Sequence, residues 1–270
     1  MCAEIPTGTC GPLWVQVSWE YTDPTGAVVS GSTTQQANVD CPADPTGNQV
    51  LVLLTLSNPG IAEATASALA TNAVSWASSA VDPKVLVVLD ENHHDEFASD
   101  ADYVAALLDA AGVEAVRFDE LDGGVATTDL EGFDVVWYSN PGYPMDDFAS
   151  FEALQAFGAQ GGGLVLQGDD MAWSWGGGFL MSPLTHLDFL SNGTEFCGVW
   201  TDNNQGSDYL VTIGSDAHPV IAGLEGQSFL YGDDIDSAVA RGEGETVLAT
   251  ATLDGGGGCD TVPVVVAWEP

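Results

Sequence analysis

Basic side chains are almost absent from this sequence of 270 residues. Lys84, Arg117 and Arg241 stand against 40 aspartate and glutamate residues, so the formal charge at neutral pH is -37. A polyanion of this kind repels nucleic acids and anionic membrane surfaces, so we expect neither as a partner. Self-repulsion also disfavours the compact state unless salt screens it or cations such as calcium bind. The composition therefore indicates a protein of a salty or extracellular setting.

Long apolar runs and metal-binding cysteine spacings are also missing. No stretch approaches about 18 uninterrupted apolar residues, so no transmembrane helix is predicted, and no signal peptide is visible. The cysteines lack a CxxC or Cys/His spacing, which argues against zinc. Cys10 with Cys41 and Cys197 with Cys259 are candidate disulfides, with Cys2 left over, while free thiols in a reducing cell are the alternative. We expect an extracellular or periplasmic protein.

Residues 1–80 are predicted to form a β-rich module. Residues 13–19 alternate polar and apolar side chains, residues 27–29 follow a Pro-Thr-Gly turn, and residues 49–56 form a continuous apolar strand. Residues 61–79 are rich in alanine and have few helix breakers, so they predict a connecting helix.

Residues 81–270 change to alternating strands and helices. The expected strands are 85–89, 113–118, 133–138, 163–167, 209–213, 246–251 and 262–268, and the expected helices are 100–111, 146–158 and a short one at 182–190. In the first helix Tyr103, Ala106, Leu107 and Ala110 have helical spacing, and Gly112 ends it. The predicted class is α/β, with a flavodoxin-like, mostly parallel sheet covered by helices on both faces.

Three segments carry a family resemblance. They are GGGLVLQG at 161–168, DAHPVIAGL at 216–224 and PVVVAWE at 263–269. In this order they resemble the ThuA-like (trehalose-utilisation-type) branch of the class I glutamine amidotransferase-like superfamily, over about residues 84–270. The resemblance implies a domain associated with carbohydrate metabolism.

The turn after the central strand departs from the active members of that superfamily. Those enzymes carry a cysteine nucleophile there, whereas this chain has Gln167, Gly168, Asp169 and Asp170. Glutaminase chemistry is therefore excluded by the sequence.

Ligands of open α/β sheets bind outside the carboxyl ends of the strands, so the loops that follow strands are the candidate sites. The first loop, after residue 89, offers Asp90, His93 and His94 as metal ligands, for a hard cation or, with imidazole, a transition metal. An acidic first turn of a helix is the alternative.

The second loop offers Asn140 and Tyr143, and the resemblance implies an oxyanion-hole donor there; a plain Pro-Gly turn is the alternative. The third loop combines carboxylates with two indole rings, a pairing typical of sugar sites. Its candidate ligand-binding residues are Asp169, Asp170, Trp173 and Trp175. A helix N-cap followed by core tryptophans would explain them equally well.

We predict that these loops meet at one crevice of an extracellular, carbohydrate-associated binding or accessory module. The alternatives are a sugar-directed hydrolase or isomerase, with a general base or a divalent metal, and a structural acidic domain. Catalytic candidates for the enzyme are His93, Asp169 and His218, although His218 could equally be structural. A divalent cation such as calcium is the one cofactor that the pattern indicates.

Overall fold

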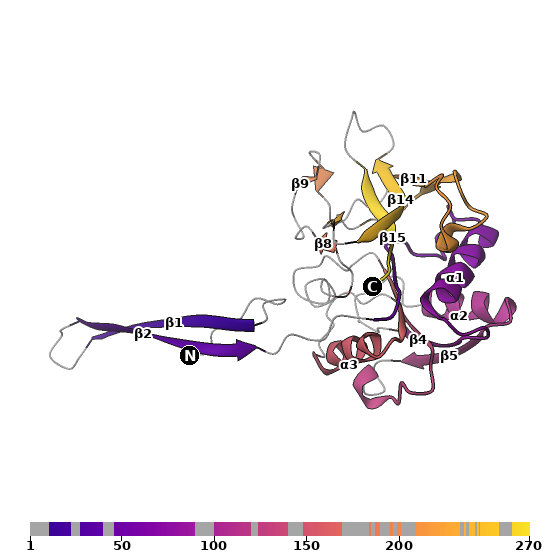
Figure 1. Ribbon diagram of the computed structural model, residues 1–270. Coiled ribbons are helices and arrows are strands. Elements are labelled where there is room, and N and C mark those ends of the chain that lie inside the picture. Colours follow the sequence, from indigo (N-terminus) through magenta and orange to yellow (C-terminus); the bar gives the residue numbers. More distant parts are fainter. Residues whose placement is uncertain are drawn as a thin grey trace. The chain divides into compact units, whose positions relative to one another are not determined.

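The computed structural model divides the chain into two compact units, Met1–Ala43 and Asp44–Pro270. The structure describes residues 11–22, 28–39, 46–89, 100–119, 124–139, 148–168, 184, 187–189, 195–196, 199–200, 209–232, 235, 238–240, 242, 244–253 and 261–270. The described part of the first unit consists of β1 (Gly11–Thr22) and β2 (Val28–Val39), which pair antiparallel from Gly11 with Val39 to Thr22 with Val28 (Figure 1). The alternating residues 13–19 therefore lie within β1, while the predicted turn at residues 24–26 lies outside the described residues.

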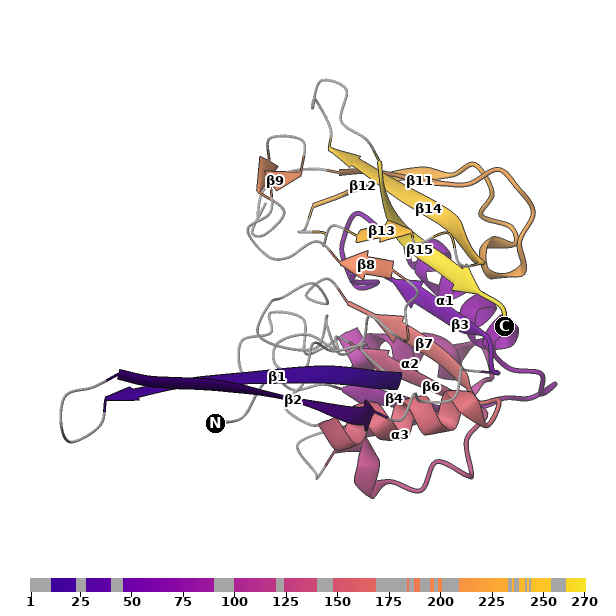
Figure 2. The same cartoon turned by 60° about the vertical axis from the view of Figure 1, so that its left-hand side comes forward.

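The described part of the second unit is built around a nine-stranded sheet, with the order β12-β11-β14-β15-β3-β7-β6-β4-β5 (Figure 2). Its strands are β3 (Gln49–Val52), β4 (Lys84–Leu89), β5 (Glu114–Asp119), β6 (Val135–Ser139), β7 (Gly163–Gln167), β11 (Tyr209–Ile213), β12 (Ser228–Tyr231), β14 (Glu245–Leu253) and β15 (Val262–Trp268). The strands from β3 to β5 in this order pair in parallel, and those from β12 to β15 pair antiparallel. The predicted α/β class is confirmed.

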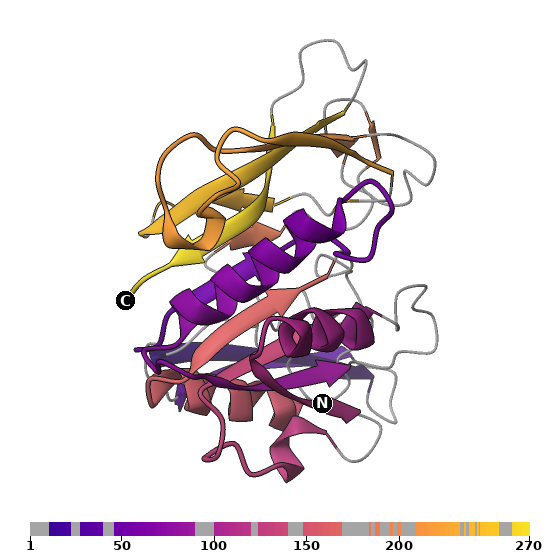
Figure 3. The ribbon, with the colours of Figure 1, turned by 90° about the vertical axis from the view of Figure 1, so that its right-hand side faces the viewer.

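Helices α1 (Glu63–Ala77), α2 (Asp100–Ala110) and α3 (Phe148–Ala159) connect the parallel strands, and α1 and α2 lie side by side (Figure 3). The short elements are the 3-10 turns η2 (Val125–Thr127) and η3 (Pro219–Ile221), and the strand pairs β8 (Leu187–Phe189) with β13 (Ala238–Ala240) and β9 (Glu195–Phe196) with β10 (Val199–Trp200). No helix in the described ranges is long and apolar enough to cross a membrane.

The division between the units lies well before the boundary near residue 80 that the sequence predicts. Strand β3 pairs with β7 on one side and β15 on the other, so it is an inner strand of the large sheet. Helix α1 buries Leu69, Ala70 and Val74 in the same core. The segment expected to connect two modules is thus part of the second unit.

Two local predictions differ from the structure. The helix expected at 182–190 is wrong for residues 187–189. These alternating residues form strand β8, which pairs with β13. The inward face of α2 is carried by Val104, Leu107 and Leu108, while Ala106 and Ala110 are exposed. Bulky aliphatic side chains gain more from burial than alanine, so they set which side of the helix faces the core.

The glycine run before β7 has a structural cause. Gly161 has a φ of 93° and ends α3, where its amide and that of Gly162 donate to the carbonyl oxygens of Gly158 and Phe157. A Cβ at Gly162 would overlap the Phe157 ring, and one at Gly163 would overlap the carbonyl oxygen of Ala77. Helix capping and close packing therefore account for all three residues.

Candidate functional site

Three parallel strands end side by side at one edge of the sheet. Leu89, the last residue of β4, is in register with Ser139, the last of β6, and Ser139 is in register with Gln167, the last of β7. Gln167 is in turn level with Val52 at the end of β3. This carboxyl edge is where ligands bind in open α/β sheets, so it is the candidate site.

The Gln167 side chain is the centre of a buried hydrogen-bond network at this edge. Its Oε1 accepts from the Trp137 indole N–H at 3.1 Å and from the Ser139 hydroxyl at 3.0 Å. Its Nε2 donates to the carbonyl oxygen of Leu54 at 3.0 Å and to Asp100 Oδ2. Every hydrogen-bonding position of the amide is therefore used.

The orientation of this amide follows from its partners. An indole N–H can only donate, so the atom facing Trp137 must be the amide oxygen. The NH2 group then faces a carbonyl and a carboxylate, both of which accept. Because the arrangement satisfies every partner, it fixes the end of β7 firmly.

Asp100 joins this network to the segment after β3. It is the first residue of α2, and its carboxylate accepts from the Ser57 amide at 2.8 Å and the Leu56 amide at 3.1 Å. The Asp100 side chain is buried, and both of its oxygens accept hydrogen bonds. The start of α2 is therefore held to both β7 and residues 56–57.

The segment after β3 belongs to this edge as well. Its Asn58 side chain is buried and accepts from the Gly60 amide at 2.9 Å, and the Thr55 amide donates to the Tyr231 hydroxyl at 2.9 Å. Sequence reasoning missed this segment because it assigned residues 49–56 to another module.

Tyr103 lies one turn after Asp100 on α2. Burial raises the pKa of its phenol, and the negative charges of Glu63 and Asp100 raise it further. The tyrosine is therefore a neutral hydrogen-bonding group at physiological pH. The sign of these charges makes this part of the edge unfavourable for anions.

His218 has a structural environment in η3. Its Nδ1 accepts from the Val220 amide at 3.2 Å, and its ring lies 5.2 Å from that of Trp76, centre to centre. Burial lowers the pKa of the imidazole, while Glu269 acts in the opposite direction. Glu269 follows Trp268, which pairs with Gln49 at the start of β3, so His218 lies toward the amino end of that strand. His218 therefore caps η3 and packs its ring against Trp76.

The other predicted site residues lie outside the described ranges. They are Asp90, His93, His94, Asn140, Tyr143, Asp169, Asp170, Trp173 and Trp175, together with the five cysteines. What the structure gives is the position of the strand ends that precede them: Leu89, Ser139 and Gln167 are neighbours. Among the described residues, no group of three or more His, Cys, Asp or Glu could hold a metal.

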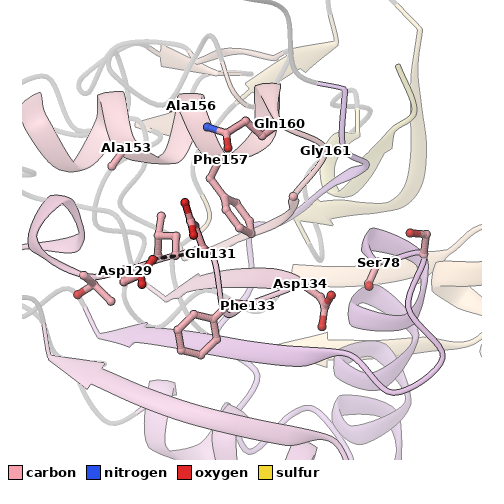
Figure 4. Close-up of a pocket in the computed structure, with 14 residues that line it drawn as sticks. Ser78, Asp129, Glu131, Phe133, Asp134, Ala153, Ala156, Phe157, Gln160 and Gly161 are labelled. Atoms are coloured by element: carbon pink, nitrogen blue, oxygen red, sulfur yellow. Dashed lines mark hydrogen bonds between the residues drawn. The ribbon is translucent and has the colours of Figure 1, made fainter.

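A depression of about 610 Å³ lies at the opposite edge of the sheet (Figure 4). Asp129, Glu131 and Asp134, on the segment that leads into β6, line one side of it, and Phe157 of α3 and Gln160 just after α3 also line it. Asp134 accepts from the backbone amide of Lys84 at 2.9 Å, so that carboxylate fixes the start of β4. Because the depression faces the amino ends of β6 and β7, it is not the edge where such sheets bind ligands.

The sequence contains a signal for the Gln167 hydrogen-bond network, although the prediction of the loop sites did not use it. Ser139 and Gln167 are polar last residues of two otherwise apolar strands, and Asp100 begins a helix on its buried face. Buried polar residues are usually hydrogen-bonded to each other or to the backbone, but their pairing requires the strand order.

The comparisons with known proteins add no identification. No protein-family model matches the chain, and the search of curated proteins found no significant match. The functional argument therefore depends on the geometry of the carboxyl edge.

Proposed function

We propose that the second unit binds a neutral carbohydrate at the carboxyl edge of its parallel strands and does so without nucleophilic chemistry. The observation that carries the proposal is the register of Leu89, Ser139 and Gln167. Consecutive Cα atoms are about 3.8 Å apart, so the segments that follow these residues must begin at one edge. Those segments bring the acids, imidazoles and indoles of the candidate site.

We infer a doubly wound, flavodoxin-like arrangement for the parallel part. Right-handed crossovers are nearly universal, and β3-α1-β4 and β4-α2-β5 move across the sheet in one direction, whereas β6-α3-β7 moves in the other. This would place α3 on the face opposite α1 and α2. The neighbouring glycines support it, because the Cβ direction at Gly162 meets α3 and that at Gly163 meets the end of α1.

The strand order reverses between β4 and β6, since β5 lies on one side of β4 and β6 on the other. Open α/β sheets bind their ligands at such a reversal. Residues 90–99 follow β4 and residues 140–147 follow β6, so Asp90, His93, Asn140 and Tyr143 belong to the segments that flank it.

The described end of β7 offers no nucleophile of the cysteine or serine type. Gln167 is buried and uses its whole amide in structural hydrogen bonds, and Gly168 has a φ of 152° and no side chain. Asp169 and Asp170 could accept hydrogen bonds from sugar hydroxyls, and Trp173 and Trp175 could stack on a pyranose ring. The charge of -37 favours a neutral ligand over an anionic one.

A thermal-shift screen of the full chain tests the proposal. Neutral mono- and disaccharides, including maltose and cellobiose, are compared with phosphorylated sugars and with calcium alone. We expect a neutral sugar to raise the unfolding midpoint, and Trp173→Ala or Trp175→Ala to abolish the rise. A rise with calcium that sodium chloride of the same ionic strength does not reproduce would favour the metal-assisted alternative, and no rise with any glycan would contradict the proposal.

A further inference from the structure

We propose that Gln167 is a positioning residue for this site: it holds the attachment points of three loops in one arrangement, and sugar affinity depends on it. The inference rests on the proposed function for the identity of the ligand. The role of Gln167 in holding the loop attachment points can be tested without any ligand. We call Asp100, Ser139 and Gln167 the loop anchors.

The loop anchors are the described residues next to the three segments that carry the candidate ligand groups. Asp100 directly follows residues 90–99, Ser139 directly precedes residues 140–147, and Gln167 is separated from residues 169–183 by Gly168 alone. Each anchor side chain is buried. Whatever fixes these three residues relative to one another also fixes where the segments attach.

Gln167 is the only anchor that contacts both others through its side chain, as far as the described residues show. Its Oε1 accepts from Ser139 at 3.0 Å and its Nε2 donates to Asp100. Asp100 extends the connection to the Leu56 and Ser57 amides, and Nε2 also reaches the Leu54 carbonyl. Removing the Gln167 amide would therefore remove the side-chain hydrogen bonds that join Gln167 to Ser139, Asp100 and the Leu54 carbonyl, and leave only the backbone pairing of β6 with β7 and the bonds of Asp100 to residues 56–57.

Glutamine suits this position better than other side chains of similar length. A glutamate would put a second carboxylate beside Asp100 and a lone pair against the Leu54 carbonyl. A methionine would fill the same volume but leave the Trp137 and Ser139 donors without their acceptor. The position thus requires one oxygen that accepts two hydrogen bonds and one NH2 group that donates two.

The chain provides a matched control at Gln49. It is also a buried glutamine at an end of a parallel strand in the same sheet, at 4% exposure. Within the described part of the chain, neither its side-chain nitrogen nor its oxygen has a hydrogen-bond partner. Gln49 is the first residue of β3, away from the carboxyl edge, so Gln49→Met changes the same atoms without disconnecting an anchor.

Hydrogen exchange of the full chain is measured for the native sequence, Gln167→Met and Gln49→Met. For Gln167→Met we expect exchange at least about tenfold faster at residues 54–57, 100–104 and the last residues of β6 and β7, relative to β11 and β14. A factor of ten corresponds to about 1.4 kcal/mol of local protection. Gln49→Met should leave this ratio unchanged. Should Gln167→Met not fold, Ser139→Ala removes one donor and permits the same comparison at β6 and β7.

Binding of maltose and cellobiose to the same variants separates the two proposals. We expect at least about a tenfold loss of affinity for Gln167→Met and none for Gln49→Met. Unchanged affinity would overturn the positioning role and leave the sugar site standing. Faster exchange at all anchors with no sugar bound by the native chain would support the anchoring and refute the carbohydrate function. Uniform acceleration across the sheet, or at one anchor alone, would overturn the positioning proposal.

Discussion

The Gln167 side chain donates a hydrogen bond to the Asp100 carboxylate across 67 residues of sequence, and both residues are 1% exposed. The bond joins the last residue of β7 to the first residue of α2. The polar side chains beneath the carboxyl edge are therefore hydrogen-bonded to one another. Removing any one of them from such a buried network costs stability, because its partners lose their hydrogen bonds.

Asp100→Ala should destabilise the second unit by about 3 kcal/mol or more. The change leaves the Leu56 amide and one N–H of the Gln167 NH2 group buried without an acceptor, at about 1–3 kcal/mol each, and the more exposed Ser57 amide also loses its partner. Urea denaturation measures the loss. Asp109→Ala, an exposed change on the same helix, should alter stability by less than about 0.5 kcal/mol. Equal effects of the two variants would contradict the buried network.

Gly163→Ala should cost about 1–3 kcal/mol, because the new methyl group would overlap the carbonyl oxygen of Ala77 and push α1 away from β7. Gly132→Ala is the matched control, since nothing lies within 4 Å of its Cβ direction. The control should be neutral, or stabilising by less than about 1 kcal/mol. The measurement is the denaturation midpoint, and a Gly163→Ala protein as stable as the native chain would refute the close packing of α1 on β7.

His218→Asn should weaken the loss of stability on mild acidification. The folded-state pKa of His218 is lowered by burial, so the unfolded chain binds the proton first as the pH falls through the ordinary value of 6.5. Stability contributed by the neutral imidazole is present above that pH and is lost below it. Asparagine keeps a side-chain oxygen for the Val220 amide but does not titrate.

The measurement for His218 is the free energy of unfolding at about pH 7.5 and about pH 5.5, on either side of the unfolded-state value of the imidazole. The drop should be smaller in His218→Asn than in the native chain. An identical drop would show that other groups carry the whole dependence.

Sodium chloride should raise the unfolding temperature between about 0.1 M and about 1 M, where the Debye length falls from about 10 Å to about 3 Å. The cause is screening of 40 carboxylates that only three basic residues oppose. The described ion pairs, Lys84 with Glu114 and Arg117 with Asp102, are exposed, so their screening costs little. The rise should level off near the upper concentration, and a flat or falling unfolding temperature would contradict self-repulsion as the main electrostatic term.

Much of the fold was predictable because its signal is local. Strands β7, β11 and β15 begin and end where the apolar runs do, and Gly112, with a φ of 84°, ends α2 as its position suggests. The place of β3 was not predictable in this way. A continuous apolar run shows that a strand is buried, but not which strands lie beside it.

The sequence predicts at which edge of the sheet the candidate site lies, but not the side-chain contacts there. The rule that ligands bind at carboxyl ends selects the segments after β4, β6 and β7, and the strand register brings the starts of those segments together. The network beneath them could not be read from the sequence, because Asp100 and Gln167 meet only through the strand order and the position of α2.

Calorimetric titration of the full chain with neutral disaccharides tests the central claim most directly. Two double variants are compared with the native chain. One carries Asp169→Asn and Asp170→Asn. The other carries Asp129→Asn and Glu131→Gln, which remove the same amount of charge from the depression at the other edge. The account predicts that the native chain and the depression variant bind a sugar with equal affinity, while the Asp169 and Asp170 variant loses at least about tenfold, or about 1.4 kcal/mol. Equal affinity in all three proteins, or a loss confined to the depression variant, would contradict it.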